Sequence, residues 1–226
     1  MEKTVYDIIV IGAGATGLMA ASEIAMTGKS VAVIEARDRA GGRIHTINDP
    51  DFELPVEMGA EFIHGKLDPT FTLLKKASAP PYNVTADIWQ HEDGIIREQK
   101  DFVEDPRLLG RQFKQLEHDI SVNDFIENYL QGDEFEDVRF TLKNYVEGYY
   151  AADTLKSSTF SLRDDLQGSD EKQYRAEGGY GKMIAYLYEE CLKHDVSFLL
   201  SQPVKEVAWR RQHVVIKTER GIFEGS

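Results

Sequence analysis

Two short apolar runs near the start of the chain are separated by a glycine-rich turn and a helical pattern. The first run covers residues 6–11 and is short enough for a buried strand of a parallel sheet. A helical pattern follows from Leu18 to Ala25 and is closed by Gly28, and the second apolar run covers residues 31–34. This order predicts a strand–helix–strand unit whose two strands are parallel.

The turn after the first strand predicts a dinucleotide-binding site. It reads Gly12-Ala13-Gly14-Ala15-Thr16-Gly17, and Glu35 ends the second strand. Gly12 permits a tight turn because a Cβ there would clash, Gly14 admits a pyrophosphate, and Gly17 lets the helix pack closely on the sheet. The phosphates would lie at the helix N-terminus, and Glu35 would accept both ribose hydroxyls and repel a 2′-phosphate. The predicted cofactor-binding residues of this turn are Gly12, Gly14, Ala15, Thr16 and Gly17.

The segment after the second strand indicates which dinucleotide is bound. It reads Glu35-Ala36-Arg37-Asp38-Arg39-Ala40-Gly41-Gly42-Arg43-Ile44-His45-Thr46. Gly41 and Gly42 allow the backbone to approach a cofactor, and Arg37 and Arg43 can neutralise a diphosphate. The segment closely resembles the signature that follows the second strand in the flavin-dependent amine oxidase superfamily, which includes monoamine and polyamine oxidases. That resemblance implies FAD as the cofactor, bound by Glu35, Ala36, Arg37, Gly42 and Arg43.

A second block, from Val56 to Gly65, resembles the flavin-facing segment of the same superfamily. Its glycines suit a chain that must lie flat beside a planar ring. The block ends in Ile-His-Gly, which is common in the polyamine oxidase branch, and the resemblance implies that His64 faces the substrate cavity as the catalytic residue. The alternative is a histidine that is hydrogen-bonded to backbone and has no role in turnover. The remaining residues that the resemblance assigns to FAD are Gly59, Ala60, Glu61, Phe62 and, through its backbone at the adenine edge, Val204.

The middle of the chain is predicted to be mainly helical. Asp68 would cap a short helix that runs to Ala77, residues 79–81 read as a linker, and residues 86–90 and 95–98 read as a β-hairpin. Ser121 would cap one helix, and another helix is expected from about Asp133 to Ala151. The apolar and aromatic stripe of this last helix could bind an amine through its ring faces, but core packing is the favoured interpretation. The stripe consists of Phe135, Val138, Leu142, Tyr145, Val146 and Tyr149.

The last part of the chain returns to an α/β pattern. A glycine-rich turn over residues 174–181 precedes an amphipathic helix from about Lys182 to His194, and Cys191 on its apolar face is expected in the core. Strands are predicted over residues 197–200, 204–210 and 214–218, and the alternation in the second predicts one buried face. Arg175 would either contact the flavin or a phosphate, or form a structural salt bridge.

The predicted fold class is therefore α/β, with a Rossmann-like FAD-binding domain made of the βαβ unit and a β-meander. Residues 1–78 and 166–226 would form that domain, and residues 79–165 a mainly helical substrate-domain insertion. In the superfamily that this chain resembles, the chain continues for roughly the same length again. We therefore expect the sequence to be incomplete, with a C-terminal half or a partner chain supplying the remainder.

Composition narrows the choice of partners. The 226 residues carry a formal net charge of −13 with a pI near 4.9, which argues against nucleic acid and anionic membranes as partners. The acidity could steer a cationic substrate, although a solvated acidic surface is the simpler meaning. One cysteine leaves no disulfide framework, no signal peptide is seen before the first strand, and no apolar stretch is long enough to span a bilayer, so a cytoplasmic location is expected. No metal site is predicted.

The resemblance implies an oxidoreductase of the amine oxidase type. Hydride would pass from the amine Cα to flavin N5, an imine would form, and O₂ would reoxidise the flavin to give H₂O₂. The partners would then be a small-molecule amine and O₂. Two alternatives remain open: a desaturase-like or protoporphyrinogen-oxidase-like flavoenzyme, and a catalytically incomplete fragment that binds FAD or another nucleotide without turnover.

Overall fold

The computed structural model describes residues 4–84, 88–92, 94–99, 103, 105–168 and 172–225. The chain divides into two compact units, a first unit of residues 1–84 and 172–226 and a second unit of residues 85–171. The two ends of the chain therefore build one unit, and the segment between them builds the other. The domain boundaries expected from the sequence, after residues 78 and 165, each lie six residues before these divisions.

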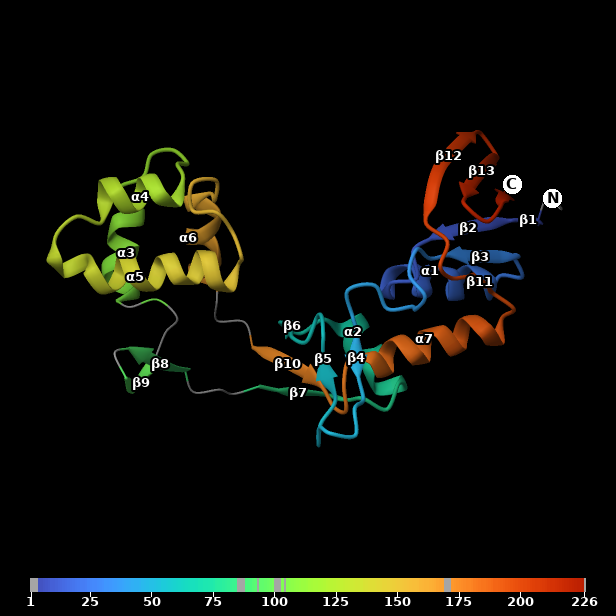
Figure 1. Ribbon diagram of the computed structural model, residues 1–226, viewed down its shortest axis with the longest axis horizontal. Helices are drawn as coiled ribbons and strands as arrows, with labels where there is room; N and C mark the ends of the chain where they lie inside the picture. The colour runs from blue at the N-terminus through green and yellow to red at the C-terminus, as the bar shows by residue number, and fades with distance from the viewer. Residues whose placement is uncertain are drawn as a thin grey trace. The chain divides into compact units, whose positions relative to one another are not determined.

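The first unit contains a parallel three-stranded sheet in the order β11-β3-β2 (Figure 1). Helix α1 (Ala15–Ala25) connects β2 (Ile8–Ile11) to β3 (Val31–Ile34), and Ile8 of β2 stands opposite Val31 of β3. All four residues of β3 are buried because it lies between β2 and β11 (Ser197–Leu199). The strand–helix–strand prediction is confirmed.

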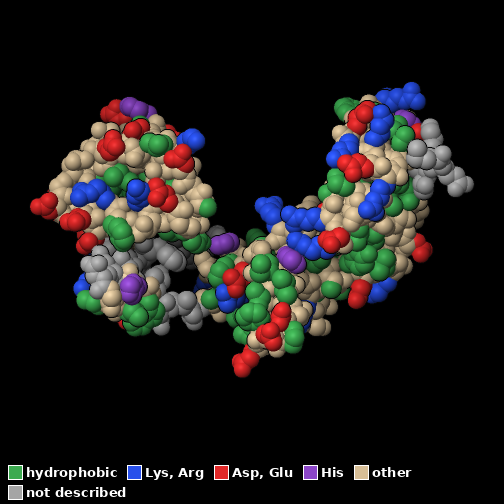
Figure 2. Space-filling view, viewed as in Figure 1, with side chains coloured by type: hydrophobic (Ala, Val, Ile, Leu, Met, Phe, Trp, Pro, Cys, Tyr) green, Lys and Arg blue, Asp and Glu red, His purple; other side chains and the backbone are tan. Residues whose placement is uncertain are grey.

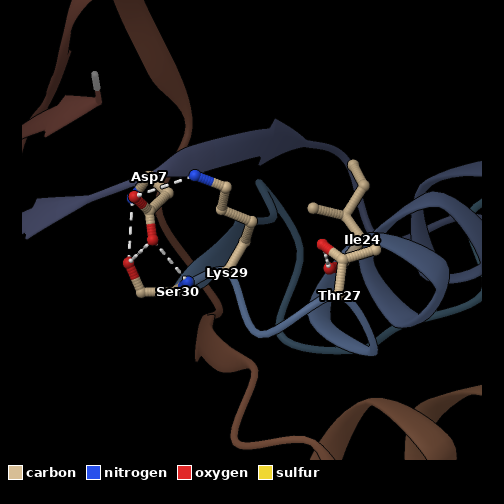
Figure 3. A network of polar contacts seen from close by, with 5 residues as sticks. All are labelled: Asp7, Ile24, Thr27, Lys29 and Ser30. Atoms are coloured by element: carbon tan, nitrogen blue, oxygen red, sulfur yellow. Dashed lines mark hydrogen bonds and ion pairs between the residues drawn. The ribbon is translucent and has the colours of Figure 1, made fainter.

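Asp7 divides the predicted first strand into two. Strand β1 (Thr4–Tyr6) pairs in parallel with β14 (Ile222–Gly225) in a different sheet, whereas β2 begins after Asp7. The Asp7 carboxylate accepts hydrogen bonds from the backbone N–H and the hydroxyl of Ser30, at 2.7 and 2.8 Å, and the Lys29 ammonium lies 3.8 Å away (Figure 3). The bond from the Ser30 backbone is the main cause of the lowered pKa of Asp7. These contacts hold the start of β2 beside the start of β3.

Two further helices pack in the core of the first unit. Helix α7 (Gly181–Lys193) packs against α1, and the Cys191 thiol is fully buried and donates to the carbonyl of Leu18, which confirms Cys191 as a core residue. Helix α2 (Asp68–Lys76) contacts α7. The prediction that Asp68 caps α2 is wrong, because Asp68 is the first helical residue and Leu67 occupies the capping position without a side-chain hydrogen bond.

A small antiparallel sheet has the order β6-β10-β7, formed by β6 (Ile63–His64), β10 (Gln173–Ala176) and β7 (Pro81–Asn83). Its presence overturns the predicted linker at residues 79–81. Ala79 is fully buried, and Pro81 begins β7, where the missing N–H of proline is tolerated at the start of an edge strand.

A four-stranded sheet has the order β1-β14-β13-β12 and joins the two ends of the chain. Strands β12 (Val204–Arg210) and β13 (His213–Thr218) confirm the predicted meander. The predicted buried face of β12 is wrong, because residues 205–210 are all exposed and Trp209 is 80% exposed. Alternation of apolar and polar residues identifies two faces of a strand, but it does not require that anything covers either face.

The second unit is mainly helical and also contains a hairpin of β8 (Ile88–Glu92) and β9 (Ile95–Gln99). Its helices are α3 (Pro106–Phe113), α4 (Val122–Tyr129), α5 (Glu136–Asn144) and α6 (Thr159–Gly168). The Ser121 hydroxyl accepts from the N–H of Asp124, so the predicted cap of α4 is confirmed. Helix α6 was not predicted. Residues 86, 87 and 93 of the predicted hairpin lie outside the described part of the chain.

The predicted helix from 133 to 151 is divided into three geometries. A 3₁₀ turn, η1 (Asp133–Phe135), precedes α5, and a π-helical turn, η2 (Tyr145–Tyr149), follows it. Core packing is confirmed for most of its apolar stripe, but Tyr149 is 53% exposed. Across the described residues, no helix combines the length and the apolar character that a membrane crossing requires.

Candidate functional site

The glycine turn between β2 and α1 is the first part of the candidate site. Gly12 has φ of +100°, a left-handed value that disfavours other residues, and nothing lies within 4 Å of where its Cβ would be. The expected role of Gly12 is therefore correct, but the reason is backbone conformation and not a clash. A Cβ on Gly17 would lie 2.0 Å from the Gly12 carbonyl oxygen, so close packing of the helix on the turn requires glycine there.

The N-terminus of α1 has no side-chain cap. Gly14 is the N-cap residue, and no acidic residue lies in the first turn. The N–H groups at the start of a helix have no partner within the helix, so those of Gly14, Ala15 and Thr16 need an acceptor from elsewhere. A Cβ on Gly14 would meet only the Cα of Gly42, at 4.0 Å. The arrangement suits an anionic group that approaches the backbone.

Glu35 is the acid at the end of β3, and it is only 8% exposed. Its Oε2 accepts from the N–H of Ala13 at 2.7 Å, and its Oε1 accepts from the N–H of Arg37 at 2.9 Å. Glu35 therefore connects the glycine turn to the arginine-containing loop, a role that the sequence did not predict. Each carboxylate oxygen has a second lone pair, so contact with ribose hydroxyls stays a prediction.

The loop over residues 36–43 folds back onto the glycine turn. Gly41 donates its N–H to the Ala13 carbonyl at 2.8 Å, and a Cβ on Gly42 would lie 3.3 Å from the Cα of Gly14. Arg37 donates to the Gly42 carbonyl at 2.8 Å. The predicted residues Ala36, Arg37 and Arg43 are all exposed beside this contact.

Arg39 was not among the predicted site residues. Its guanidinium donates to the carbonyls of Ala40, Gly42 and Ile44, at 3.2, 3.2 and 3.3 Å. A planar guanidinium can reach several acceptors at once, so Arg39 fixes the shape of the loop. Its position inside the arginine-rich segment was visible, but nothing in the sequence separated this inward-facing arginine from Arg37 and Arg43.

The predicted flavin-facing segment lies against the same loop. Met58 donates its N–H to the His45 carbonyl at 2.7 Å, and Ala60 donates to the Arg43 carbonyl at 2.9 Å. A Cβ on Gly59 would lie 2.0 Å from the Arg43 carbonyl oxygen, so only glycine allows this approach. The segment and the loop therefore form a continuous backbone surface, on which Gly59 and Ala60 are exposed.

A second connection ties this segment to α7, 120 residues further along the chain. Strand β4 (Thr46–Ile47) pairs with β5 (Val56–Glu57), and the Thr46 hydroxyl donates to Glu57 at 2.7 Å. The same hydroxyl accepts from the N–H of Gly181 at 2.7 Å, and Glu57 accepts from the N–H of Tyr180 at 2.6 Å. Thr46 and Glu57 thus supply acceptors for the first N–H groups of α7. No local pattern could have identified this pair.

Arg175 and His64 lie on one face of the β6-β10-β7 sheet. His64 stands opposite Gln173, and Gln173 and Arg175 point to the same side of β10 because they are two residues apart. The opposite face carries the buried Ile63 and packs against the core. His64 itself is exposed, and its catalytic role stays a prediction.

Arg175 forms an ion pair with Glu61 and lies over the ring of Phe62, with Cζ 4.8 Å from the ring centroid. The salt-bridge interpretation of Arg175 is therefore confirmed. Its Nε–H is buried, and no group in the described part of the chain accepts a hydrogen bond from it. A buried donor without an acceptor is uncommon, and this one lies beside Glu61 and Phe62.

Val204 is the first residue of β12, and a hydrogen bond two residues before it connects the chain to Glu35. The N–H of Gln202 donates to the Glu35 carbonyl at 2.9 Å, two residues before Val204. Val204 pairs with Thr218, and the register shifts before Glu206. The irregular start of β12 therefore lies beside the acid at the end of β3.

Comparison with known proteins gives these contacts a context. A family model described as "Flavin containing amine oxidoreductase" matches residues 15–107 and 98–222. Probable polyamine oxidase 4 of Arabidopsis thaliana is 42% identical over 83 residues, which is 36% of this chain and 16% of that protein. A putrescine oxidase structure matches all of this chain with a TM-score of 0.72 at 18% identity. The match spans 57% of the putrescine oxidase chain. Cyclohexylamine oxidase from Brevibacterium oxydans has a TM-score of 0.70 at 18% identity, and this chain spans 56% of it.

Proposed function

The chain belongs to the flavin containing amine oxidoreductase family, and from that premise we propose that it provides the ADP-binding part of the FAD site of an amine oxidase. The observation that carries the proposal is the contact between the glycine turn and Glu35. An uncapped helix N-terminus and a buried carboxylate lie within one hydrogen-bond network there. These are the two groups that a diphosphate and a ribose require.

The residues of the site fit FAD in two further respects. The loop of residues 36–43 and the segment of residues 58–62 present exposed backbone next to each other, held in place by glycines that leave no room for side chains. The buried Nε–H of Arg175 is an unsatisfied donor beside Glu61 and Phe62. The proposed FAD residues are those of the glycine turn with Glu35, Ala36, Arg37, Gly42, Arg43, Gly59, Ala60, Glu61, Phe62 and Val204.

When bound, FAD supplies a two-electron acceptor that O₂ can reoxidise, and this is the chemistry that the amine oxidation requires. The chain's own residues bind and orient the cofactor. Glu35 and the α1 N-terminus would hold the ADP moiety, and Thr46 and Glu57 would hold the flavin-facing segment against α7. His64 is proposed to face the substrate, on the sheet face that it shares with Arg175.

The proposed substrate class is a small aliphatic amine, because polyamine oxidases are among the curated relatives that match part of this chain. The comparisons do not favour a desaturase or protoporphyrinogen-oxidase activity. A cytoplasmic location also belongs to the proposal.

Two measurements test the proposal in sequence. The purified chain is mixed with FAD, and unbound FAD is then removed. The chain is expected to retain flavin absorbance. Peroxide release is then measured with polyamines, monoamines and amino acids, and polyamines are expected to give the fastest rates. A chain that retains no flavin would overturn the proposal. A chain that retains flavin but releases no peroxide with any amine would support the alternative of nucleotide binding without turnover.

A further inference from the structure

The acidic residues of the chain are concentrated in its second unit, the mainly helical one. Between residues 85 and 171 there are 21 Asp and Glu residues and nine Lys and Arg residues, which gives this unit a formal charge of −12. The whole chain carries a formal charge of −13, so the first unit, of residues 1–84 and 172–226, is close to neutral at −1. Acidic side chains are spread over the visible face of the helical unit (Figure 2). The net charge of this unit therefore favours the approach of cations, and the other unit has almost no net charge to do so.

Three tyrosines and one aspartate form a cluster in this acidic unit. The rings of Tyr145 and Tyr149 are stacked at 5.1 Å, and the ring of Tyr150 meets both edge to face, at 5.2 and 5.3 Å. Asp165 on α6 accepts hydrogen bonds from the hydroxyls of Tyr145 and Tyr150, the former at 3.2 Å. Tyr149 is 53% exposed and Tyr150 is 41% exposed, so two of the three rings can be reached from solvent.

The π-helical turn η2 is what brings the three rings together. In an α-helix Tyr149 would share a face with Tyr145, but Tyr150 would point away. The N–H of Tyr150 instead donates to the Tyr145 carbonyl, an i→i+5 bond that places Tyr150 above Tyr145 as well. Ala151 then leaves the helix with φ of +50°, an unfavourable value for a residue other than glycine. Such irregular turns cost free energy and are frequent at functional sites.

The chemistry of the cluster suits an organic cation. Burial, together with the hydrogen bond to Asp165, raises the pKa of Tyr150, and burial also raises that of Tyr145, so both phenols stay protonated and donate to the carboxylate. Ring faces and a carboxylate are the two groups that bind alkylammonium ions in proteins. Asp165 could also serve only to hold α6 to the end of α5, and that structural role would involve no ligand.

We propose that Tyr145, Tyr149, Tyr150 and Asp165 form a binding site for an aliphatic ammonium group, separate from the residues proposed to bind FAD. The choice of an amine as ligand rests on the proposed function, whereas the binding of a cation rests on the cluster alone. The site lies entirely within the helical unit. It would raise the concentration of a diamine or polyamine at the acidic surface of that unit.

The test uses the full chain without FAD, with ¹³C-labelled tyrosine rings observed by NMR during titration with putrescine at constant ionic strength. The expected result is saturable shifts of the Tyr149 and Tyr150 ring signals, with no shifts from 1,4-butanediol, which has the same length and no charge. Because FAD and turnover are absent from this experiment, a failure of the proposed oxidase activity would not affect its outcome.

Two variants and a matched control separate a site from general charge attraction. Asp165→Asn is expected to weaken putrescine binding about tenfold. Asp164→Asn removes the same charge from the adjacent residue, which is paired with Arg163 outside the cluster, and is expected to change binding less than twofold. Tyr149→Leu removes a ring without touching the carboxylate, and it should also weaken putrescine binding. It provides the test if Asp165→Asn does not fold. Absence of tyrosine shifts in the native chain, or equal losses in the two aspartate variants, would overturn the proposal.

Discussion

The Oε2 atom of Glu35 accepts a hydrogen bond from the backbone N–H of Ala13 at 2.7 Å, across 22 residues of sequence. The acid at the end of β3 thus holds the turn that follows β2. The same carboxylate accepts from the N–H of Arg37, which begins the loop that folds back on that turn. Glu35 is therefore both a candidate ribose ligand and an organiser of the site around it.

Replacing Glu35 by Ala is expected to weaken the binding of ADP and FAD by roughly 1–3 kcal/mol, because charge-assisted hydrogen bonds are lost. Isothermal titration with ADP measures the change directly. Glu23→Ala, which removes the same charge from an exposed position on α1, should leave ADP affinity unaltered. If the affinity of Glu35→Ala equals that of the native chain, the assignment of Glu35 to the ribose is wrong.

Gly17→Ala is expected to destabilise the chain by about 1–3 kcal/mol, since its Cβ would lie 2.0 Å from the Gly12 carbonyl oxygen. Gly110→Ala is the matched control. Gly110 lies inside α3 with nothing within 4 Å of the added Cβ, so alanine there should stabilise by about 0.5–1 kcal/mol. Urea unfolding of both variants gives the two free energies, and opposite signs are predicted. Two changes of the same sign would show that α1 does not pack on the turn as described.

Thr46→Val removes the hydroxyl that joins Glu57 to the N-terminus of α7. A loss of about 1–2 kcal/mol in the free energy of unfolding is expected, together with faster hydrogen exchange at the Gly181 amide. Thr72→Val serves as the control, because the Thr72 hydroxyl donates only to an exposed carbonyl within α2, and its effect should stay within about 0.5 kcal/mol. Equal effects of the two substitutions would contradict the proposed connection between β4, β5 and α7.

Cys191 gives a prediction about pH. Burial raises the pKa of its thiol from the ordinary value of 9.0 to about 11, so the folded chain favours the protonated form. The contribution of this group to stability is therefore complete below pH 9 and is lost as the pH rises through about 11. At pH 8 the native chain should react slowly with a thiol reagent, and the urea-unfolded chain should react fast. Equal rates in the two states would mean that Cys191 is not buried.

The parts of the fold that follow from local sequence were predictable. The strand–helix–strand unit, the Ser121 cap and the buried face of α7 each follow from a pattern within one continuous stretch of sequence. Helix α6 escaped prediction because Ser and Thr near its start favour turns when considered alone, and its start is held by Thr159 donating to Ile120, 39 residues away.

The candidate site was predictable in its glycines and acid, but not in the contacts that shape it. Arg39 was indistinguishable in sequence from its neighbouring arginines, although it donates to the carbonyls of Ala40, Gly42 and Ile44. Thr46 and Glu57 gain their roles from Gly181 and Tyr180, which no spacing in the sequence connects to them. The exposed face of β12 was mispredicted for a related reason, since an alternating pattern carries no information on what covers a sheet.

The binding of an ADP moiety at the glycine turn is the claim on which the proposed function depends, and amide NMR spectra recorded during ADP titration test it most directly. The largest saturable shifts are expected at the amides of Gly12 to Gly17 and of Glu35 to Arg37. Saturating ADP that leaves those amides unshifted, or that shifts only residues elsewhere in the chain, would contradict that claim.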